Sequence, residues 1–225
     1  MKIGLLLIST GGYNIFIDPL LSSIRRHFMP GGNVEIVLFT DRMRVLEKNV
    51  TTIYKEHESW PYITLKRFRI FSTYEEIIRN YDYLYYCDID MLFVSSVSEE
   101  IIGNRVATIH PGFLGGKGTP ERRQESRACI LNNEENTYFA GGFFGGSSSE
   151  FIKMSTLLSA EIDEDLYNGI IAVHNDESHL NRYYMNNPPD LVLSPSYCYP
   201  ETWVLPFRKK ILALNKNHME VRRQK

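Results

Sequence analysis

Asp88 and Asp90 are the residues of this 225-residue sequence whose type and spacing most clearly suggest chemistry. They stand between two apolar runs, residues 81–86 and 91–94. Burying an unpaired carboxylate is costly, so two carboxylates at the end of a core strand need a cation or a solvent-facing cleft. Residues two apart in an extended chain point the same way, so both can offer oxygens to one hard cation that also holds phosphate. The alternative is a strand that ends in an acidic surface turn.

A second acidic pair, Asp176 and Glu177, lies in the run 173–182, VHNDESHLNR. We predict a helix that is capped by Asn175, continues through Leu180 and is stopped by the two prolines that start at Pro188. Acids in a first helical turn are favoured by the helix dipole and need no catalytic role. A helix that begins in a cleft would also hold a carboxylate ready for attack or for electrostatic stabilisation. Both interpretations remain open at this stage.

The elements that must position these acids alternate between strand and helix. We predict strands at 3–8, 35–39 and 50–54, a helix at 17–27 and a turn at 10–13. This alternation is typical of an α/β fold with a parallel sheet, in which ligands bind beyond the carboxyl ends of the strands. The turn at 10–13 and the Asp88–Asp90 pair should therefore share one sheet edge. Classical dinucleotide and P-loop sites are disfavoured, because neither glycine fingerprint is present.

Four further segments complete the pattern. An apolar stripe after Trp60 predicts a helix with Lys66 and Arg69 on its solvated face, and glycines at 112–118 predict a loop-rich insertion. In the run 138–146, YFAGGFFGG, the paired glycines allow the backbone to approach a ligand closely or mark a bend. The polar tail 215–225 is either frayed or folds over an anionic ligand.

Composition sets the broad class of protein. The sequence is 43% apolar and 23% charged, which is ordinary for a soluble globular protein. A net charge of −2 argues against a nucleic-acid partner, because no broad basic surface is available. The three cysteines, Cys87, Cys129 and Cys198, fit neither a disulfide framework nor a zinc site and favour a reducing compartment. The apolar run 3–8 is too short for a transmembrane span.

Five segments taken in order resemble glycosyltransferase family 6, the retaining α-1,3-galactosyl- and N-acetylgalactosaminyltransferases that include the blood-group A and B enzymes. The segments are Asp88-Ile89-Asp90, residues 110–113 with 121–123 (HPGF and ERR), 141–146 (GGFFGG), 176–181 (DESHLN), and the tail 216–222. The resemblance covers Ile8 to Arg222. It implies a GT-A fold, an α/β domain over 1–225 whose mixed, mostly parallel sheet is flanked by helices. Within it we expect a nucleotide-binding half (1–97), an acceptor and catalytic half (98–210) and a tail (211–225) that closes over the donor.

The resemblance also implies roles for particular residues. Glu177 corresponds to the proposed nucleophile or ion-pair stabiliser, and Asp88 and Asp90 to the ligands of Mn²⁺. His110 and Glu201 are candidates for binding the acceptor. The residues expected to bind the UDP-sugar donor are Ile8, Thr10, Tyr13, Arg67, Asp88, Ile89, Asp90, Ala140, Gly141, Gly142, Asp176, Lys216 and Arg222.

We expect a Mn²⁺-dependent hexosyltransferase that moves GalNAc or Gal from UDP to the 3-hydroxyl of an acceptor galactoside. The small Gly142 leaves room for a 2-acetamido group, which favours UDP-GalNAc over UDP-Gal. Metal dependence is expected because both acids are kept, whereas some bacterial members have Asn-x-Asn. The alternatives are a UDP-sugar hydrolase and a non-catalytic protein that binds nucleotide sugars or carbohydrate.

Three departures from the family's pattern bear on the substrates and the location. Ile8 stands where mammalian members have Phe, His174-Asn175 replaces Trp-His, and Pro200-Glu201 falls where they have an acceptor-binding acid. The acceptor, an oligosaccharide or glycoconjugate, therefore stays open. The sequence shows no cytosolic tail, anchor or stem, so it resembles the short soluble members of bacteria and their viruses. We expect a cytoplasmic enzyme of a bacterial or virus-infected bacterial cell, without a transmembrane segment.

Overall fold

The main sheet of the protein has seven strands in the part of the chain that the structure describes. The structure is a computed structural model that describes residues 1–43, 48–116, 118–131 and 137–223. The strands of the sheet, in chain order, are β1 (Lys2–Ser9), β2 (Asn33–Thr40), β3 (Val50–Tyr54), β4 (Tyr83–Cys87), β6 (Arg105–Ile109), β7 (Phe139–Ser147) and β8 (Leu191–Leu193). Their spatial order is β3-β2-β1-β4-β7-β6-β8. Only β7 is antiparallel to its neighbours, so the sheet is mixed and mostly parallel, as predicted.

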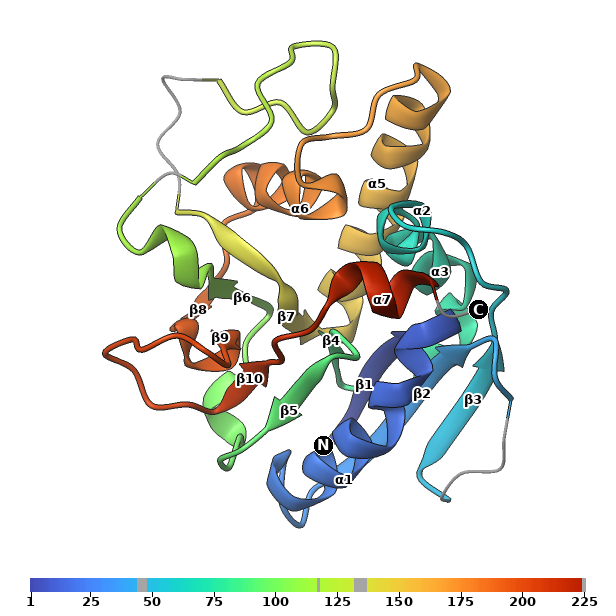
Figure 1. Cartoon of the computed structure of the whole chain (residues 1–225), viewed down its shortest axis with the longest axis vertical. Coiled ribbons are helices and arrows are strands. Elements are labelled where there is room, and N and C mark those ends of the chain that lie inside the picture. Colours follow the sequence, from blue (N-terminus) through green and yellow to red (C-terminus); the bar gives the residue numbers. More distant parts are fainter. Residues whose placement is uncertain (44–47, 117, 132–136, 224–225) are drawn as a thin grey trace.

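A small second sheet and the helices cover the main sheet. The small sheet has the order β5-β10-β9, formed by β5 (Met91–Phe93), β9 (Tyr199–Pro200) and β10 (Ile211–Ala213). The α-helices are α1 (Ile17–His27), α2 (Tyr62–Leu65), α3 (Arg67–Thr73), α4 (Glu75–Ile78), α5 (Ser148–Tyr167), α6 (Asn175–Asn186) and α7 (His218–Arg223). The 3₁₀ helices are η1 (Gly11–Phe16), η2 (Glu99–Ile101), η3 (Pro111–Phe113) and η4 (Pro195–Tyr197). Helix α1 and the small sheet lie over one face of the main sheet, and α3, α5 and α6 over the other (Figure 1).

The strands in the centre of the sheet are buried on both faces, which explains their nearly continuous apolar runs. In β1, Leu5 and Leu7 join the core beneath α1, whereas Leu6 and Ile8 join the core beneath α3 and α5. Strand β4 contributes to both cores in the same alternating way. Because both faces are covered, a ligand can reach these strands only at their ends.

The predicted elements at 3–8, 17–27, 35–39 and 50–54 are confirmed as β1, α1, β2 and β3. The single helix expected after Trp60 is wrong, because this stretch forms the three short helices α2, α3 and α4. The backbone leaves helical geometry at Lys66 (ψ 9°) and at Tyr74 (ψ 25°). The two apolar runs around Asp88 also belong to different sheets, since β4 ends at Cys87 and β5 joins β10.

Helix α6 begins where it was predicted, but the expected cap is wrong. His174 occupies the N-cap position, and its side chain makes no capping hydrogen bond, although its backbone N–H donates to the Ser178 hydroxyl (3.0 Å). Asn175 is already its first residue and has φ +52°, a left-handed conformation that asparagine tolerates better than most residues. Asp176 and Glu177 lie in the first turn, as expected. In the described ranges no helix is long and apolar enough to cross a membrane.

Candidate active site

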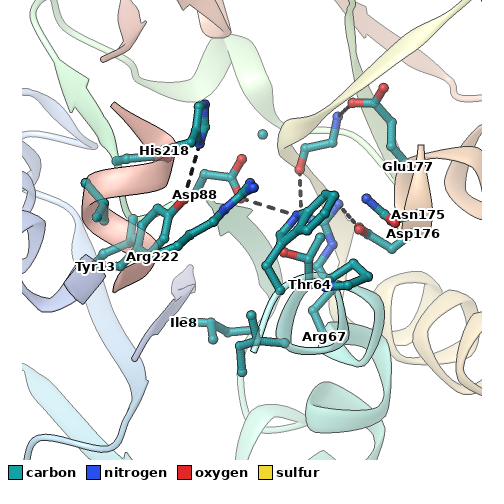
Figure 2. A pocket seen from close by; sticks show the side chains of 18 of the residues that line it. Ile8, Tyr13, Thr64, Arg67, Asp88, Asn175, Asp176, Glu177, His218 and Arg222 are labelled. Carbon is teal, nitrogen blue, oxygen red and sulfur yellow. Dashed lines mark hydrogen bonds and ion pairs between the residues drawn. The ribbon is translucent and has the colours of Figure 1, made fainter. Parts of the chain in front are cut away.

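The carboxyl ends of β1 and β4 open into a cavity of about 1120 Å³. Strands β1 and β4 are parallel neighbours, so the turn after β1 and the Asp88–Asp90 turn after β4 lie on one edge, as predicted. The cavity wall also includes β7, the start of α6 and the C-terminal tail (Figure 2). All the predicted donor-site residues line the cavity except Ala140, and Glu177 lines it as well. Ala140 is instead buried in the core beneath α1.

Arg67 is a buried cation at the centre of this wall. Its guanidinium donates to the carbonyl of Gly141 (2.9 Å), contacts Asp176 and lies 3.6 Å from Asp88 (Figure 2). The same group lies 4.6 Å from the ring centroid of Tyr86, which adds a cation–π contact. Arg67 therefore links the start of α3 to β7, to α6 and to the acidic turn after β4.

Asp176 and Arg67 stabilise each other's charge. Burial opposes the charge on Arg67, but Asp176, Tyr86 and Asp88 outweigh it and raise the pKa of the guanidinium. Burial raises the pKa of Asp176 to about 6, and Arg67 limits that rise. Both groups are therefore ionised at neutral pH, and Asp176 stays in place as the partner of Arg67.

Glu177 is a buried carboxyl group whose pKa lies close to neutral pH. It lies one residue after Asp176, and its Oε2 accepts a hydrogen bond from the N–H of Gly141 (2.7 Å). Burial raises the pKa of Glu177 to about 7, while the Gly141 hydrogen bond opposes the rise. Burial and the Glu177 charge also raise the pKa of the Tyr138 phenol, so this neighbouring hydroxyl remains neutral. A carboxylate with this pKa is half ionised near pH 7 and is fixed in orientation by a backbone donor.

Gly141 joins the two charged groups because it has no side chain. Its carbonyl accepts from Arg67 and its N–H donates to Glu177. A Cβ atom at this position would lie 2.6 Å from a guanidinium nitrogen of Arg67 and 3.4 Å from Glu177 Oε2. The sequence predicted that the paired glycines approach a ligand or mark a bend, and at Gly141 the close approach in the structure is to these two side chains.

Asp88 and Asp90 offer the oxygen ligands expected for a hard cation. Asp88 accepts from the Tyr86 hydroxyl (2.7 Å) yet keeps 42% of its side chain exposed to the cavity, and Asp90 contacts Lys216. Among the described residues no group of three or more His, Cys, Asp or Glu could hold a metal by itself. Two carboxylates suit a Mg²⁺- or Mn²⁺-like ion that takes its other ligands from phosphate and water. The donor set therefore fits the expected metal.

The C-terminal tail covers one side of the cavity. Helix α7 packs against η1 (Figure 1), and His218 Nδ1 lies 3.4 Å from the Tyr13 hydroxyl (Figure 2). The Arg222 guanidinium lies 4.2 Å from the ring centroid of Trp60. The frayed alternative for the tail is thus wrong for residues 215–223, and residues 224 and 225 of the predicted tail lie outside the described ranges.

The two predicted acceptor residues lie outside the cavity wall. Burial and the charge of His174 lower the pKa of His110 to about 4, so its ring is neutral. Nδ1 of His110 accepts from the N–H of Gly112 (3.1 Å), which leaves the ring proton on Nε2 as a hydrogen-bond donor. The Glu201 carboxylate accepts from the N–H of Asn215 (2.8 Å) and so holds the start of the tail.

Sequence reasoning missed two residues near the turn after β1. His57 lines the cavity, and its Nδ1 lies 3.0 Å from the Thr10 hydroxyl. Asp41, just after β2, accepts from the N–H of Gly11 (2.9 Å) and holds the turn after β1. The position of Asp41 at the carboxyl end of a strand was a usable signal. His57 lies between elements and has no motif around it.

The mixed α/β sheet, with a cavity at the carboxyl ends of its strands and an Asp-x-Asp turn in the cavity wall, is consistent with a glycosyltransferase of the GT-A fold. The sequence model described as "Glycosyltransferase family 6" matches residues 1–223. The chain is 34% identical to rat histo-blood group ABO system transferase 1 (98% of this chain, 68% of the relative). It is 31% identical to chicken globoside alpha-1,3-N-acetylgalactosaminyltransferase 1 (99% and 69%) and 29% identical to the Escherichia coli O-antigen biosynthesis glycosyltransferase WbnI (90% and 90%). The chain therefore belongs to glycosyltransferase family 6 and is a hexosyltransferase.

Proposed function

We propose that this enzyme transfers GalNAc or Gal from UDP to the 3-hydroxyl of an acceptor galactoside, in α linkage with retention, and depends on Mn²⁺. The observation that carries the proposal is that one cavity brings together the Asp88–Asp90 turn, Glu177 and the tail cations Lys216 and Arg222. The name of the chicken relative, globoside alpha-1,3-N-acetylgalactosaminyltransferase 1, supports an α-1,3 linkage and a GalNAc donor, and the rat relative is named as a transferase of the histo-blood group ABO system. GalNAc is favoured over Gal because Gly142 adds no side chain to the cavity.

Each group has a distinct part in the proposed reaction. Asp88 and Asp90 would hold the divalent cation, which would supply positive charge that stabilises the departing diphosphate. Lys216 and Arg222 add charge-assisted contacts to the same phosphates. Glu177, held by the Gly141 N–H, faces the anomeric carbon and stabilises its developing positive charge, either as a nucleophile or as an ion-pair partner. Arg67 and Asp176 keep Gly141 and the start of α6 in position.

The first test is UDP release from UDP-GalNAc, UDP-Gal, UDP-GlcNAc and UDP-Glc. We expect release from UDP-GalNAc and more slowly from UDP-Gal with Mn²⁺, stimulated by galactoside acceptors and reduced at least about 100-fold by EDTA, because one charge-stabilising partner is lost. Release that EDTA leaves unchanged would contradict the metal role of Asp88 and Asp90. No release from any donor, with metal and acceptors present, would contradict the proposed reaction.

The tail cations allow a separate prediction about binding. Lys216→Met removes a positive charge that contacts Asp90, and we expect UDP affinity to fall about tenfold, or about 1.4 kcal/mol. Titration calorimetry at low and high salt measures the change, which should shrink as salt screens the charge. Lys209→Met is a matched control, since Lys209 is exposed and lies over the Tyr199 ring outside the cavity wall. Equal UDP affinity in the Lys216 and Lys209 variants would contradict a phosphate-binding tail.

A further inference from the structure

The thiol of Cys198 lies in the cavity wall next to Gly142 of β7. Cys198 follows η4, and its backbone N–H donates to the carbonyl of Pro195 (3.2 Å), which fixes the chain at this point. The residue lines the active-site cavity, although only 9% of it is exposed. Because so little of Cys198 is exposed, a ligand would contact it over a small area, and its main influence on the cavity is the volume that its side chain occupies.

Cys198 packs directly opposite Gly142. A Cβ atom on Gly142 would lie 3.1 Å from Cys198 Sγ, 3.3 Å from Asp88 Oδ2 and 3.4 Å from Met91 Sδ. Asp88 has little freedom to move away, because its other oxygen accepts from the Tyr86 hydroxyl (2.7 Å). A side chain at position 142 therefore has room only if the thiol gives way.

The glycine that packs against this thiol also joins the two acidic groups of the site. A Cβ atom on Gly142 would lie 3.3 Å from Asp88 Oδ2, and the N–H of the preceding Gly141 donates to Glu177 (2.7 Å). Burial raises the pKa of Cys198, and the negative charges of Asp88 and Glu177 raise it further, which leaves a neutral thiol near both acids. Such a thiol is a poor nucleophile at neutral pH, so its contribution is volume and polarity. Asp88 marks the metal and diphosphate end of the cavity, and Glu177 marks the end where the sugar's anomeric carbon reacts.

A sugar attached to that diphosphate must span the gap between Asp88 and Glu177, where Gly142 and Cys198 form the wall. We propose that Cys198 is a specificity-determining residue that forms the wall of the sugar-binding part of the cavity and limits the size of the sugar that fits. The inference rests on the proposed function, because it assumes a UDP-sugar in this cavity. It predicts that changes at Cys198 act on the sugar and leave the UDP part of the donor almost unaffected.

The test compares binding of UDP with binding of UDP-GalNAc and UDP-Gal by calorimetry in the presence of Mn²⁺. All variants carry Glu177→Gln so that the donor is not consumed. We expect Cys198→Leu to weaken binding of both UDP-sugars at least about tenfold and binding of UDP less than about threefold, because an overfilled wall excludes the sugar. Cys198→Ser, which keeps the size, should retain UDP-sugar binding within about threefold of the parent.

A second measurement remains informative if the leucine variant fails to fold. Gly142→Ala is introduced with Cys198 and with Cys198→Ala in a double-mutant cycle. With Cys198 in place, we expect Gly142→Ala to weaken UDP-GalNAc binding about tenfold. With Cys198→Ala, the same substitution should weaken binding by no more than about twofold, because the closest contact of the new methyl group is removed. Cys129→Ser, outside this cavity, controls for the loss of a thiol.

The possible outcomes separate this inference from the function on which it rests. A Glu177→Gln parent that binds neither UDP nor any UDP-sugar overturns the proposed function and this inference together. A parent that binds UDP-GalNAc or UDP-Gal, with Cys198→Leu binding them equally well, overturns the inference alone. If the leucine variant does not fold, the double-mutant cycle decides: effects of Gly142→Ala and Cys198→Ala on UDP-GalNAc binding that simply add would overturn the inference alone.

Discussion

Glu177→Gln is expected to lower kcat for sugar transfer by at least about 1000-fold, which corresponds to about 4 kcal/mol of transition-state stabilisation. The glutamine keeps the shape of the side chain and can still accept from the Gly141 N–H. It cannot supply the negative charge that faces the anomeric carbon in the proposed reaction. KM for the donor should change less than about threefold, because the charge acts mainly in the transition state.

This variant also separates the two catalytic classes that the sequence left open, a transferase and a hydrolase, from a passive binder. Transfer and hydrolysis both need the charge and should both be lost, whereas a passive binder would lose nothing measurable. Glu164→Gln is the matched control, since Glu164 is exposed on α5 and pairs with Arg127 away from the cavity. Transfer that survives in Glu177→Gln at more than about a tenth of the native rate would contradict the role assigned to Glu177.

The raised pKa of Glu177 adds a pH signature to the same variant. If the ionised carboxylate is required, kcat/KM of the native enzyme should rise with pH through about 7, the pKa of this group in the free protein. Between pH 4.5 and about 7 the folded protein holds a proton on Glu177 that the unfolded chain has lost, so stability falls as pH rises. Glu177→Gln has no carboxyl group at this position, so its free energy of unfolding should not show this fall. Relative to the native enzyme, the variant should become more stable as pH rises from 4.5 to about 7.

Local patterns in the sequence were sufficient to predict the frame of the fold. The apolar runs of β1, β2 and β3 and the helix α1 are each decided by burial, which the sequence records directly. The stretch after Trp60 shows the limit, because an apolar stripe continues across two breaks that contain neither Gly nor Pro. The backbone leaves helical geometry at Lys66 and Tyr74, and neither residue type predicts a break in a helix.

The candidate site was only partly readable from the sequence, for a similar physical reason. Asp88 and Asp90 stand out because acids at the end of an apolar run need an explanation, whereas the role of Glu177 came from the resemblance to the family. His57 and Cys198 reach the cavity only through the path of the chain, which pattern reasoning does not supply. The separate roles of residues 1–97 and 98–210 stay a prediction, and the main sheet draws strands from both ranges.

Arg67→Met is expected to have the largest effect on stability, about 3–5 kcal/mol in the free energy of unfolding. The side chain of Arg67 is 4% exposed and that of Asp176 1%, so removing the cation leaves a buried carboxylate without its partner. Chemical denaturation at pH 7 measures the loss. Arg69→Met is the matched control on the same helix, because Arg69 is 59% exposed and its ion pair with Asp163 should contribute less than about 1 kcal/mol.

A second substitution distinguishes the cost of the unpaired charge from the loss of packing. In Arg67→Met the pKa of Asp176 should rise above about 6, so the loss of stability should be smaller at pH 5, where the carboxyl is protonated, than at pH 8. Adding Asp176→Asn removes the charge and should restore at least about half of the loss at pH 7. Transfer activity should stay low in the double variant, because Gly141 has lost the donor that fixes its carbonyl. A double variant as unstable as Arg67→Met would show that Arg67 acts by filling space among Phe68, Tyr86 and Phe144, and that the buried ion pair does not decide the stability of the site.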